Sequence, residues 1–123
     1  MKCGGVRVNV TSVTVGIPVS NLSQARQWYE ALLQKEGPDI EPDEGILEYQ
    51  VGHTWLQLYE GVVTSSDWIF RIGVSDIHAE RSRLLALGIS IGEVEEVPDV
   101  VAYCVFQDRD GNQLSLYTVL DNS

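Results

Sequence analysis

The chain of 123 residues has room for one compact domain, residues 1–123, and none for a second. Hydrophobic residues make up 44% of the chain and charged residues 21%, an ordinary globular composition that excludes a fibrous or disordered protein. The net charge of −10 repels phosphate backbones and anionic membrane surfaces, so we expect neither nucleic acid nor a membrane as a partner.

Targeting signals and cysteine usage indicate a cytoplasmic protein. No apolar run approaches the roughly 18 residues of a membrane span, and the start of the chain lacks a signal-peptide core. The two cysteines, Cys3 and Cys104, make neither a disulfide framework nor a zinc site, and two reduced thiols suit the cytoplasm. We expect Cys3 in a floppy N-terminal stretch and Cys104 in an apolar strand.

The two halves of the chain repeat each other. A shift of 55 places residues 17–22 (Ile-Pro-Val-Ser-Asn-Leu) on residues 72–77 (Ile-Gly-Val-Ser-Asp-Ile), and a shift of 58 places residues 56–59 on residues 114–117. Ordered matches at both ends of each half predict a duplication with three extra residues in a loop of the second half. Repeat one then covers about residues 12–61, and repeat two about residues 67–119.

In the first repeat, a stretch of alternating apolar residues predicts a strand, and apolar residues at helical spacing predict a helix after it. Asn21 supplies the N-cap of this helix, and Gly37 and the following proline end the helix. Gly52 and His53 form the turn of a hairpin. The predicted elements are a strand over Val13–Val19, a helix over Leu22–Lys35, and strands over Ile46–Val51 and Trp55–Tyr59.

The second repeat follows the same order, with Asp76 as the N-cap of its helix and Gly88 as its end. The predicted elements are a strand over Trp68–Val74, a helix over Ile77–Leu87, and strands near Ser90–Val94, Val100–Phe106 and Gln113–Thr118. The second repeat shows the order β-α-β-β-β, and by the duplication each repeat is predicted to be such a module. One helix covers one face of each small sheet and leaves the other face free to line a cleft.

This arrangement resembles the vicinal oxygen chelate superfamily, which includes glyoxalase I, extradiol dioxygenases, fosfomycin-resistance enzymes and bleomycin-resistance proteins. The matching segments are residues 19–22, 28–29, 74–77, 87–88 and 108–116. The most specific is the turn Asp108-Arg109-Asp110-Gly111-Asn112, in which Arg109 replaces the family's usual proline. The resemblance implies an α+β fold in which two tandem βαβββ modules form a curved mixed sheet around a cleft, with helices on the outer face.

The resemblance also locates the positions at which metal-dependent members hold a divalent cation. Here they fall on Thr14, Gln57, Ile69 and Ser115, and none of these is a His, Asp, Glu or Cys. Such a set binds transition metals poorly, so we expect no metal and no other cofactor. We expect the two histidines, His53 and His78, on the surface.

Strand alternation sorts side chains between the helices and the cleft. The leucines at positions 56, 58, 114 and 116 are the apolar half of their strands and are predicted to face the helices, as are Trp68, Phe70 and Ile72. The other half lines the cleft, with Val101, Tyr103 and Val105 inward by resemblance to the fosfomycin enzymes. The candidate ligand-binding residues are Glu48, Gln50, Trp55, Gln57, Tyr59, Ile69, Arg71, Tyr103, Ser115 and Tyr117.

Aromatic walls with few polar groups are typical of a small-molecule site. Two acidic segments, residues 36–44 and 93–99, are expected to rim it, and an acidic rim over aromatic walls favours a cationic aromatic ligand. The leading hypothesis is a metal-independent small-molecule-binding protein that forms a homodimer, with the bleomycin-resistance proteins as a functional analogue.

Three alternatives stay open at this point. One is a metal-free enzyme of lyase, isomerase or transferase type that uses Glu48, Tyr103 or Arg71. Another is a metal-dependent glyoxalase or dioxygenase relative with displaced ligands. In the third, the cleft residues pack a dimer interface, a closed barrel or a partner chain, and the protein is a structural module.

Overall fold

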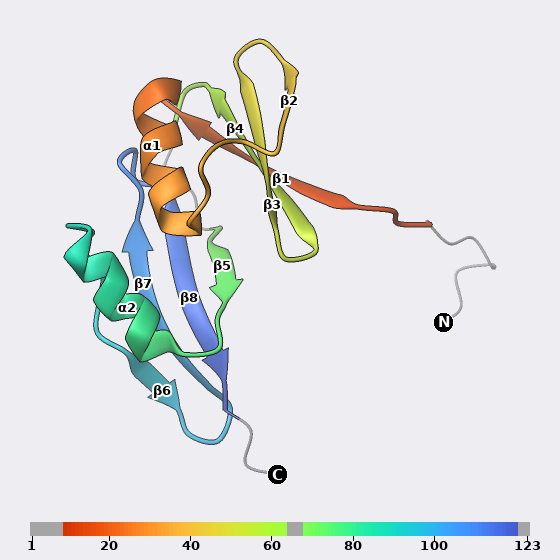
Figure 1. The fold of residues 1–123 in the computed structure, drawn as a ribbon. Coiled ribbons are helices and arrows are strands. Elements are labelled where there is room, and N and C mark those ends of the chain that lie inside the picture. The colour runs from red at the N-terminus through yellow and green to blue at the C-terminus, as the bar shows by residue number, and fades with distance from the viewer. Residues whose placement is uncertain (1–8, 64–67, 121–123) are drawn as a thin grey trace.

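The computed structural model describes residues 9–63 and 68–120, so Cys3 and the predicted floppy stretch lie outside it. Figure 1 shows two sheets, each accompanied by one helix. The first module contains β1 (Val13–Val19), α1 (Leu22–Leu33), β2 (Ile40–Asp43), β3 (Ile46–Val51) and β4 (Thr54–Glu60). The second contains β5 (Phe70–Gly73), α2 (Ile77–Ala86), β6 (Glu95–Val97), β7 (Val101–Gln107) and β8 (Gln113–Val119).

Each module forms its own four-stranded mixed sheet, in the order β1-β4-β3-β2 and β5-β8-β7-β6. The first strand of each module pairs in parallel with the last, and the remaining pairs are antiparallel. The predicted α+β fold of two βαβββ modules is confirmed. The closed-barrel alternative is wrong for the single chain, because no strand of one sheet pairs with a strand of the other within the described residues.

The strand register of one module reproduces that of the other. Gly16 pairs with Gln57 in the first sheet, and Arg71 pairs with Ser115 in the second, which are the same positions under shifts of 55 and 58. Glu48 of β3 pairs with Gln57, and Val105 of β7 pairs with Ser115, so the residues of β3 and β7 are related by a shift of 57. The three extra residues are therefore divided between two places: two precede β7, and one lies in the β7–β8 turn.

The core lies on the helix side of both sheets, where the leucines of β4 and β8 are almost completely buried as predicted. Cys104 is buried in β7, also as predicted, and burial raises the pKa of its thiol. Trp68 departs from its prediction: it is 39% exposed, because β5 begins only at Phe70.

Two other predictions about element boundaries are wrong. The strand predicted at Ser90–Val94 reduces to a single bridge between Ile91 and Phe106, and the outer strand of the second sheet is β6. Helix α1 ends at Leu33 instead of Lys35, because Gln34 takes left-handed backbone angles (φ 57°, ψ 46°) and its N–H bonds the carbonyl oxygen of Glu30. Neither helix in the described part of the chain has the length and apolar composition of a membrane span.

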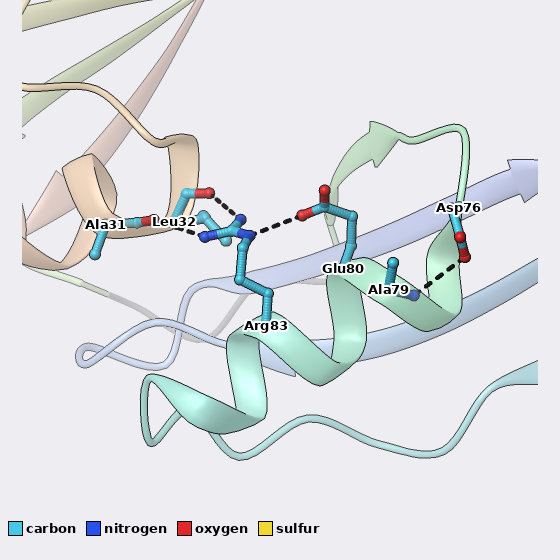
Figure 2. A network of polar contacts seen from close by, with 6 residues as sticks. All are labelled: Ala31, Leu32, Asp76, Ala79, Glu80 and Arg83. Atoms are coloured by element: carbon cyan, nitrogen blue, oxygen red, sulfur yellow. Dashed lines mark hydrogen bonds and ion pairs between the residues drawn. The ribbon is translucent and has the colours of Figure 1, made fainter.

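Helix α1 contacts both modules, and the turn between β7 and β8 holds them together. The Tyr29 hydroxyl donates to Asp108 Oδ2 at 2.7 Å, and Asn112 Nδ2 donates to the carbonyl oxygen of Pro18 at 2.9 Å. At the other end of α1, Arg83 of α2 donates to the carbonyl oxygens of Ala31 and Leu32, as Figure 2 shows. The two sheets are thus joined through a helix, and one face of each sheet stays open.

Candidate functional site

The open face of the first sheet carries five of the ten candidate ligand-binding residues. Adjacent strands place Glu48 opposite Gln57 and Gln50 opposite Trp55. Gln57 Nε2 donates to Glu48 Oε2 at 2.8 Å, so the half-buried carboxylate is hydrogen-bonded to a neutral amide. Hydrogen bonding to an amide leaves its negative charge uncompensated.

The fifth residue, Tyr59, lies across two glycines. A Cβ atom at Gly16 would come within 3.3 Å of Tyr59 Cε1, and one at Gly61 within 3.2 Å of Cε2. In the second module a Cβ at Gly73 would come within 2.9 Å of the Cζ atom of Tyr117, the tyrosine equivalent to Tyr59, although Gly73 itself is equivalent to Pro18. Glycine thus gives each tyrosine ring room to lie close to the neighbouring backbone. The sequence pattern alone did not reveal this arrangement.

The open face of the second sheet is hollowed. A cavity of about 390 Å³ is lined by Arg71, Val101, Tyr103 and Tyr117. Tyr103 and Tyr117 stand directly opposite each other on β7 and β8. Three of the four lining residues are candidates from the sequence, and the fourth, Val101, was predicted to point the same way.

Two further candidates of the second module occupy different positions. Ser115 is completely buried beneath this face, where its hydroxyl bonds the carbonyl oxygen of Leu116. Arg71 Nη1 donates to Ser115 Oγ at 3.4 Å, a long contact that leaves most of the guanidinium free for a ligand. Ile69 is half-buried and precedes β5, and it is not among the residues that line the cavity.

The structure does not bring the two halves of the predicted site together in one cavity. The hollow of the second sheet contains no residue of the first sheet. Glu48 and Arg71 are absent from the three ion pairs within the described residues, which join Arg26 to Glu30, Lys35 to Asp39 and Arg83 to Glu80. A metal-free reaction that used Glu48 with Arg71 or Tyr103 would need a contact between the two faces that this single chain does not show.

The residues at the family's metal positions do not suit a metal. They offer an exposed threonine hydroxyl, an amide already bonded to Glu48, an isoleucine and a buried serine hydroxyl (Thr14, Gln57, Ile69, Ser115). Divalent transition metals prefer imidazole, thiolate or carboxylate ligands. Within residues 9–63 and 68–120, no three His, Cys, Asp or Glu side chains are grouped as a metal site would require.

The two acidic segments supply the outer strand of each sheet, β2 and β6, and every residue of both strands is exposed. Exposed charges on a short outer strand keep other chains from pairing with it. Next to β2, Asp39 Oδ2 accepts hydrogen bonds from Lys35 Nζ at 2.6 Å and from the backbone N–H of Gln50 at 2.8 Å. Both bonds hold the pKa of Asp39 below its ordinary value, and the bond from Lys35 has the larger effect.

No protein-family model and no curated protein matches the sequence. Solved structures do match its fold. TnmS3, an antibiotic-binding protein from Streptomyces sp. CB03234, superposes with a TM-score of 0.77 at 19% identity over 92% of this chain and 99% of that one. A glyoxalase/bleomycin resistance protein from Catenulispora acidiphila gives 0.73 at 22% identity over 88% and 97%.

A lactoylglutathione lyase from Agrobacterium tumefaciens gives a TM-score of 0.72 at 13% identity over 90% of this chain and 96% of that chain. The chain has the glyoxalase/bleomycin-resistance fold. At these identities the likeness concerns the fold alone, and it agrees with the predicted resemblance to the vicinal oxygen chelate superfamily. Because the glyoxalase/bleomycin-resistance fold serves both a binding protein and an enzyme, function has to be argued from the site itself.

Proposed function

We propose that the protein binds a small aromatic molecule, without a metal, on the open faces of its sheets. The observation that carries this proposal is the cavity of about 390 Å³ between Tyr103, Tyr117, Val101 and Arg71. Its volume lies in the range of small-molecule sites, at roughly 300–1,000 Å³. Two aromatic rings and a valine offer a surface for stacking, and the guanidinium offers hydrogen bonds that orient the ligand. The description of one matched structure as an antibiotic-binding protein supports small-molecule binding.

We further propose that the ligand is cationic where it meets the first sheet. The Glu48 carboxylate is half-buried and hydrogen-bonded to the neutral Gln57 amide, so a cationic group would gain an ion pair that water screens only partly. Trp55 and Tyr59 lie on the same face and favour a cation through their rings. The net charge of −10 steers cations toward the protein.

A homodimer is part of this proposal. Strands β1 and β5 each end their sheet and expose one side of their backbone, and Val13 and Val105 on the sheets are 50% and 43% exposed. A second copy that covers these strands and faces would enclose the ligand and remove the open edges. We expect a dimer by sedimentation at micromolar concentration; a stable monomer would contradict this part. The composition, with reduced thiols, leads us to place the protein in the cytoplasm.

Calorimetric titration with naphthalene probes tests the proposal. Naphthylmethylammonium, naphthylmethanol and naphthoate share one ring system and differ in charge. We expect the cation to bind tightest, and Tyr103→Ala to weaken the cation and the neutral alcohol by about tenfold through lost ring contact. Glu48→Gln should remove the preference for the cation, whereas Trp55→Ala should weaken the cation and the neutral alcohol alike.

Two outcomes would contradict the proposal. If no probe binds at millimolar concentration, the cavity is not an aromatic site. If the cation keeps its advantage in the Glu48→Gln variant, the charge preference comes from elsewhere on this acidic surface. A charge-matched control, Glu96→Gln on the exposed strand β6, should leave every affinity as it is.

A further inference from the structure

A second and larger hollow lies between α1, the segment after α2 and the end of β7 with its turn. It has a volume of about 520 Å³, and its lining includes Trp28 of α1, Ile89 and Ser90 after α2, and Phe106 and Arg109 from β7 and its turn. A neighbouring hollow of about 230 Å³ is also lined by Trp28, Ile89 and Arg109. The two hollows share these three residues, and we call the pair the Trp28 groove.

Trp28 gives this groove a rigid aromatic wall. Its ring is half-buried and meets Tyr29 edge-on, with centroids 4.8 Å apart and planes at 72°. The centroid of the Phe106 ring lies 6.3 Å from that of Trp28, with the two planes tilted by 36°. An aromatic ring held by two others loses little freedom when a ligand stacks on it, and this makes it a good binding surface.

Arg109 gives the groove a positive charge, and among the described residues it forms no ion pair with a carboxylate. Its Nη2 donates to Gln24 Oε1 at 2.9 Å. The adjacent carboxylate, Asp108, is buried and already accepts bonds from Tyr29, Asn112 and two backbone N–H groups. The guanidinium is thus positioned by a neutral amide and keeps its remaining donors for an anion.

We propose that the Trp28 groove is a second binding site, specific for a planar aromatic carboxylate. The ring of such a ligand stacks on Trp28 and contacts Ile89, and its carboxylate pairs with Arg109. The Ser90 hydroxyl in the lining can donate a further hydrogen bond. This site differs from the open faces in position and in charge, and it gives a role to Arg109, which replaces the proline that the family resemblance leads one to expect in this turn.

Titration with naphthoate and its neutral amide, naphthamide, followed by NMR of the tryptophan indole N–H groups, tests this proposal. The three signals are assigned with the Trp28→Phe, Trp55→Phe and Trp68→Phe variants. Naphthoate should shift the Trp28 signal and bind about fivefold tighter than naphthamide, the gain expected of a partly exposed ion pair. Arg109→Gln should remove this difference, and Arg109→Lys should keep part of it. Lys35→Gln, which removes one positive charge outside the groove, should change nothing.

Three results would overturn the proposal. In the first, naphthoate leaves the Trp28 signal in place. In the second, naphthoate and naphthamide bind equally well to the unmodified protein. In the third, naphthoate shifts the Trp55 signal instead and loses affinity in Arg71→Gln, which would assign the anion to the open faces. All three concern the anion at Trp28, so they are distinguishable from failure of the cation to bind near Glu48.

Discussion

The two modules share one strand register but stabilise the ends of their helices differently. Helix α2 carries its own complementary charges, with Glu80 in its first turn and Arg83 in its last. Helix α1 has neither an acidic residue in its first turn nor a basic residue in its last. Its end groups are instead bonded from outside: Glu60 of β4 accepts from the Leu22 N–H at 3.0 Å, and Arg83 of α2 bonds two carbonyl oxygens.

This difference shows that the first module depends on the second for part of its stability. The unpaired carbonyl groups at the end of a helix need donors, and a positive charge there also compensates the helix dipole. For α1 both come from an arginine that follows it by about 50 residues in the chain. Tyr29, which bonds the turn between β7 and β8, adds a second tie between the modules.

The largest effect is expected from Asp108→Ala, which breaks this second tie. Asp108 is buried, and its carboxylate accepts bonds from Tyr29, from Asn112 and from the backbone N–H of Asp110. Its loss leaves several buried donors without a partner, so the free energy of unfolding measured in urea should decrease by about 3–5 kcal/mol. Asp110→Ala in the same turn is the control and should change the free energy of unfolding by less than about 1 kcal/mol. Equal effects of the two variants would contradict the network.

Tyr29→Phe should have the next largest effect, about 1.5–3 kcal/mol, the usual value for a hydrogen bond to a charged group. Burial, and then the negative charge of Asp108, raise the pKa of the Tyr29 hydroxyl far above its ordinary value. The folded protein therefore keeps a proton that the unfolded chain releases above about pH 10. The stabilising contribution of Tyr29 is fully present below that pH. As the pH rises further, the free energy of unfolding falls by about 1.4 kcal/mol per pH unit for one proton.

The Tyr29→Phe variant should lose this contribution, so its free energy of unfolding should fall less steeply between about pH 10 and pH 11. Tyr49→Phe is the comparison inside the first module, because the Tyr49 hydroxyl donates to Glu30 at 2.7 Å and its pKa is also raised by burial. If Tyr29→Phe leaves both the stability and its pH dependence unchanged, the bond to Asp108 contributes nothing to folding.

Arg83→Met tests the tie at the other end of α1, drawn in Figure 2. Methionine keeps the apolar part of the side chain but removes two hydrogen bonds and a charge, so we expect a loss of about 1–2 kcal/mol. Glu80→Gln is the sharp control, since it removes the ion pair within α2 and leaves the bonds to α1 in place. That partly exposed pair should contribute less than about 0.5 kcal/mol. If the control costs as much as Arg83→Met, the ion pair and not the tie to α1 carries the effect.

The smallest effect is expected from Glu60→Gln, at the N-terminus of α1. The amide oxygen can still accept from the Leu22 N–H, so only the charge interaction with the helix end is lost. We expect a decrease of about 0.5 kcal/mol in the free energy of unfolding, reduced further by salt. Glu96→Gln, on the exposed outer strand β6, should give no decrease, and a salt-independent loss in Glu60→Gln would argue against the charge interaction.

The strand faces that make up the candidate site could be predicted from the sequence, because strand alternation is a local property. The register placed Glu48 beside Gln57, and it put Arg71, Tyr103 and Tyr117 on one face of the second sheet. The predicted boundaries are wrong where the backbone conformation of one residue ends an element, as at Gln34. They are also wrong where the apolar alternation of an outer strand is weak, as at Ser90. Irregular edges depend on neighbouring strands, which a local pattern does not contain.

The sequence by itself determined the two modules, their duplication and the buried leucine rows, because a period of two in strands and of 3.6 in helices is written locally in the order of apolar residues. Only the tertiary structure decided how the modules are joined. The bonds from Arg83 to α1 and from Tyr29 to Asp108 link residues 51 to 79 positions apart. The Trp28 groove likewise combines α1, the segment after α2 and the β7–β8 turn. Such contacts depend on packing between distant segments, and no periodicity along the chain records them.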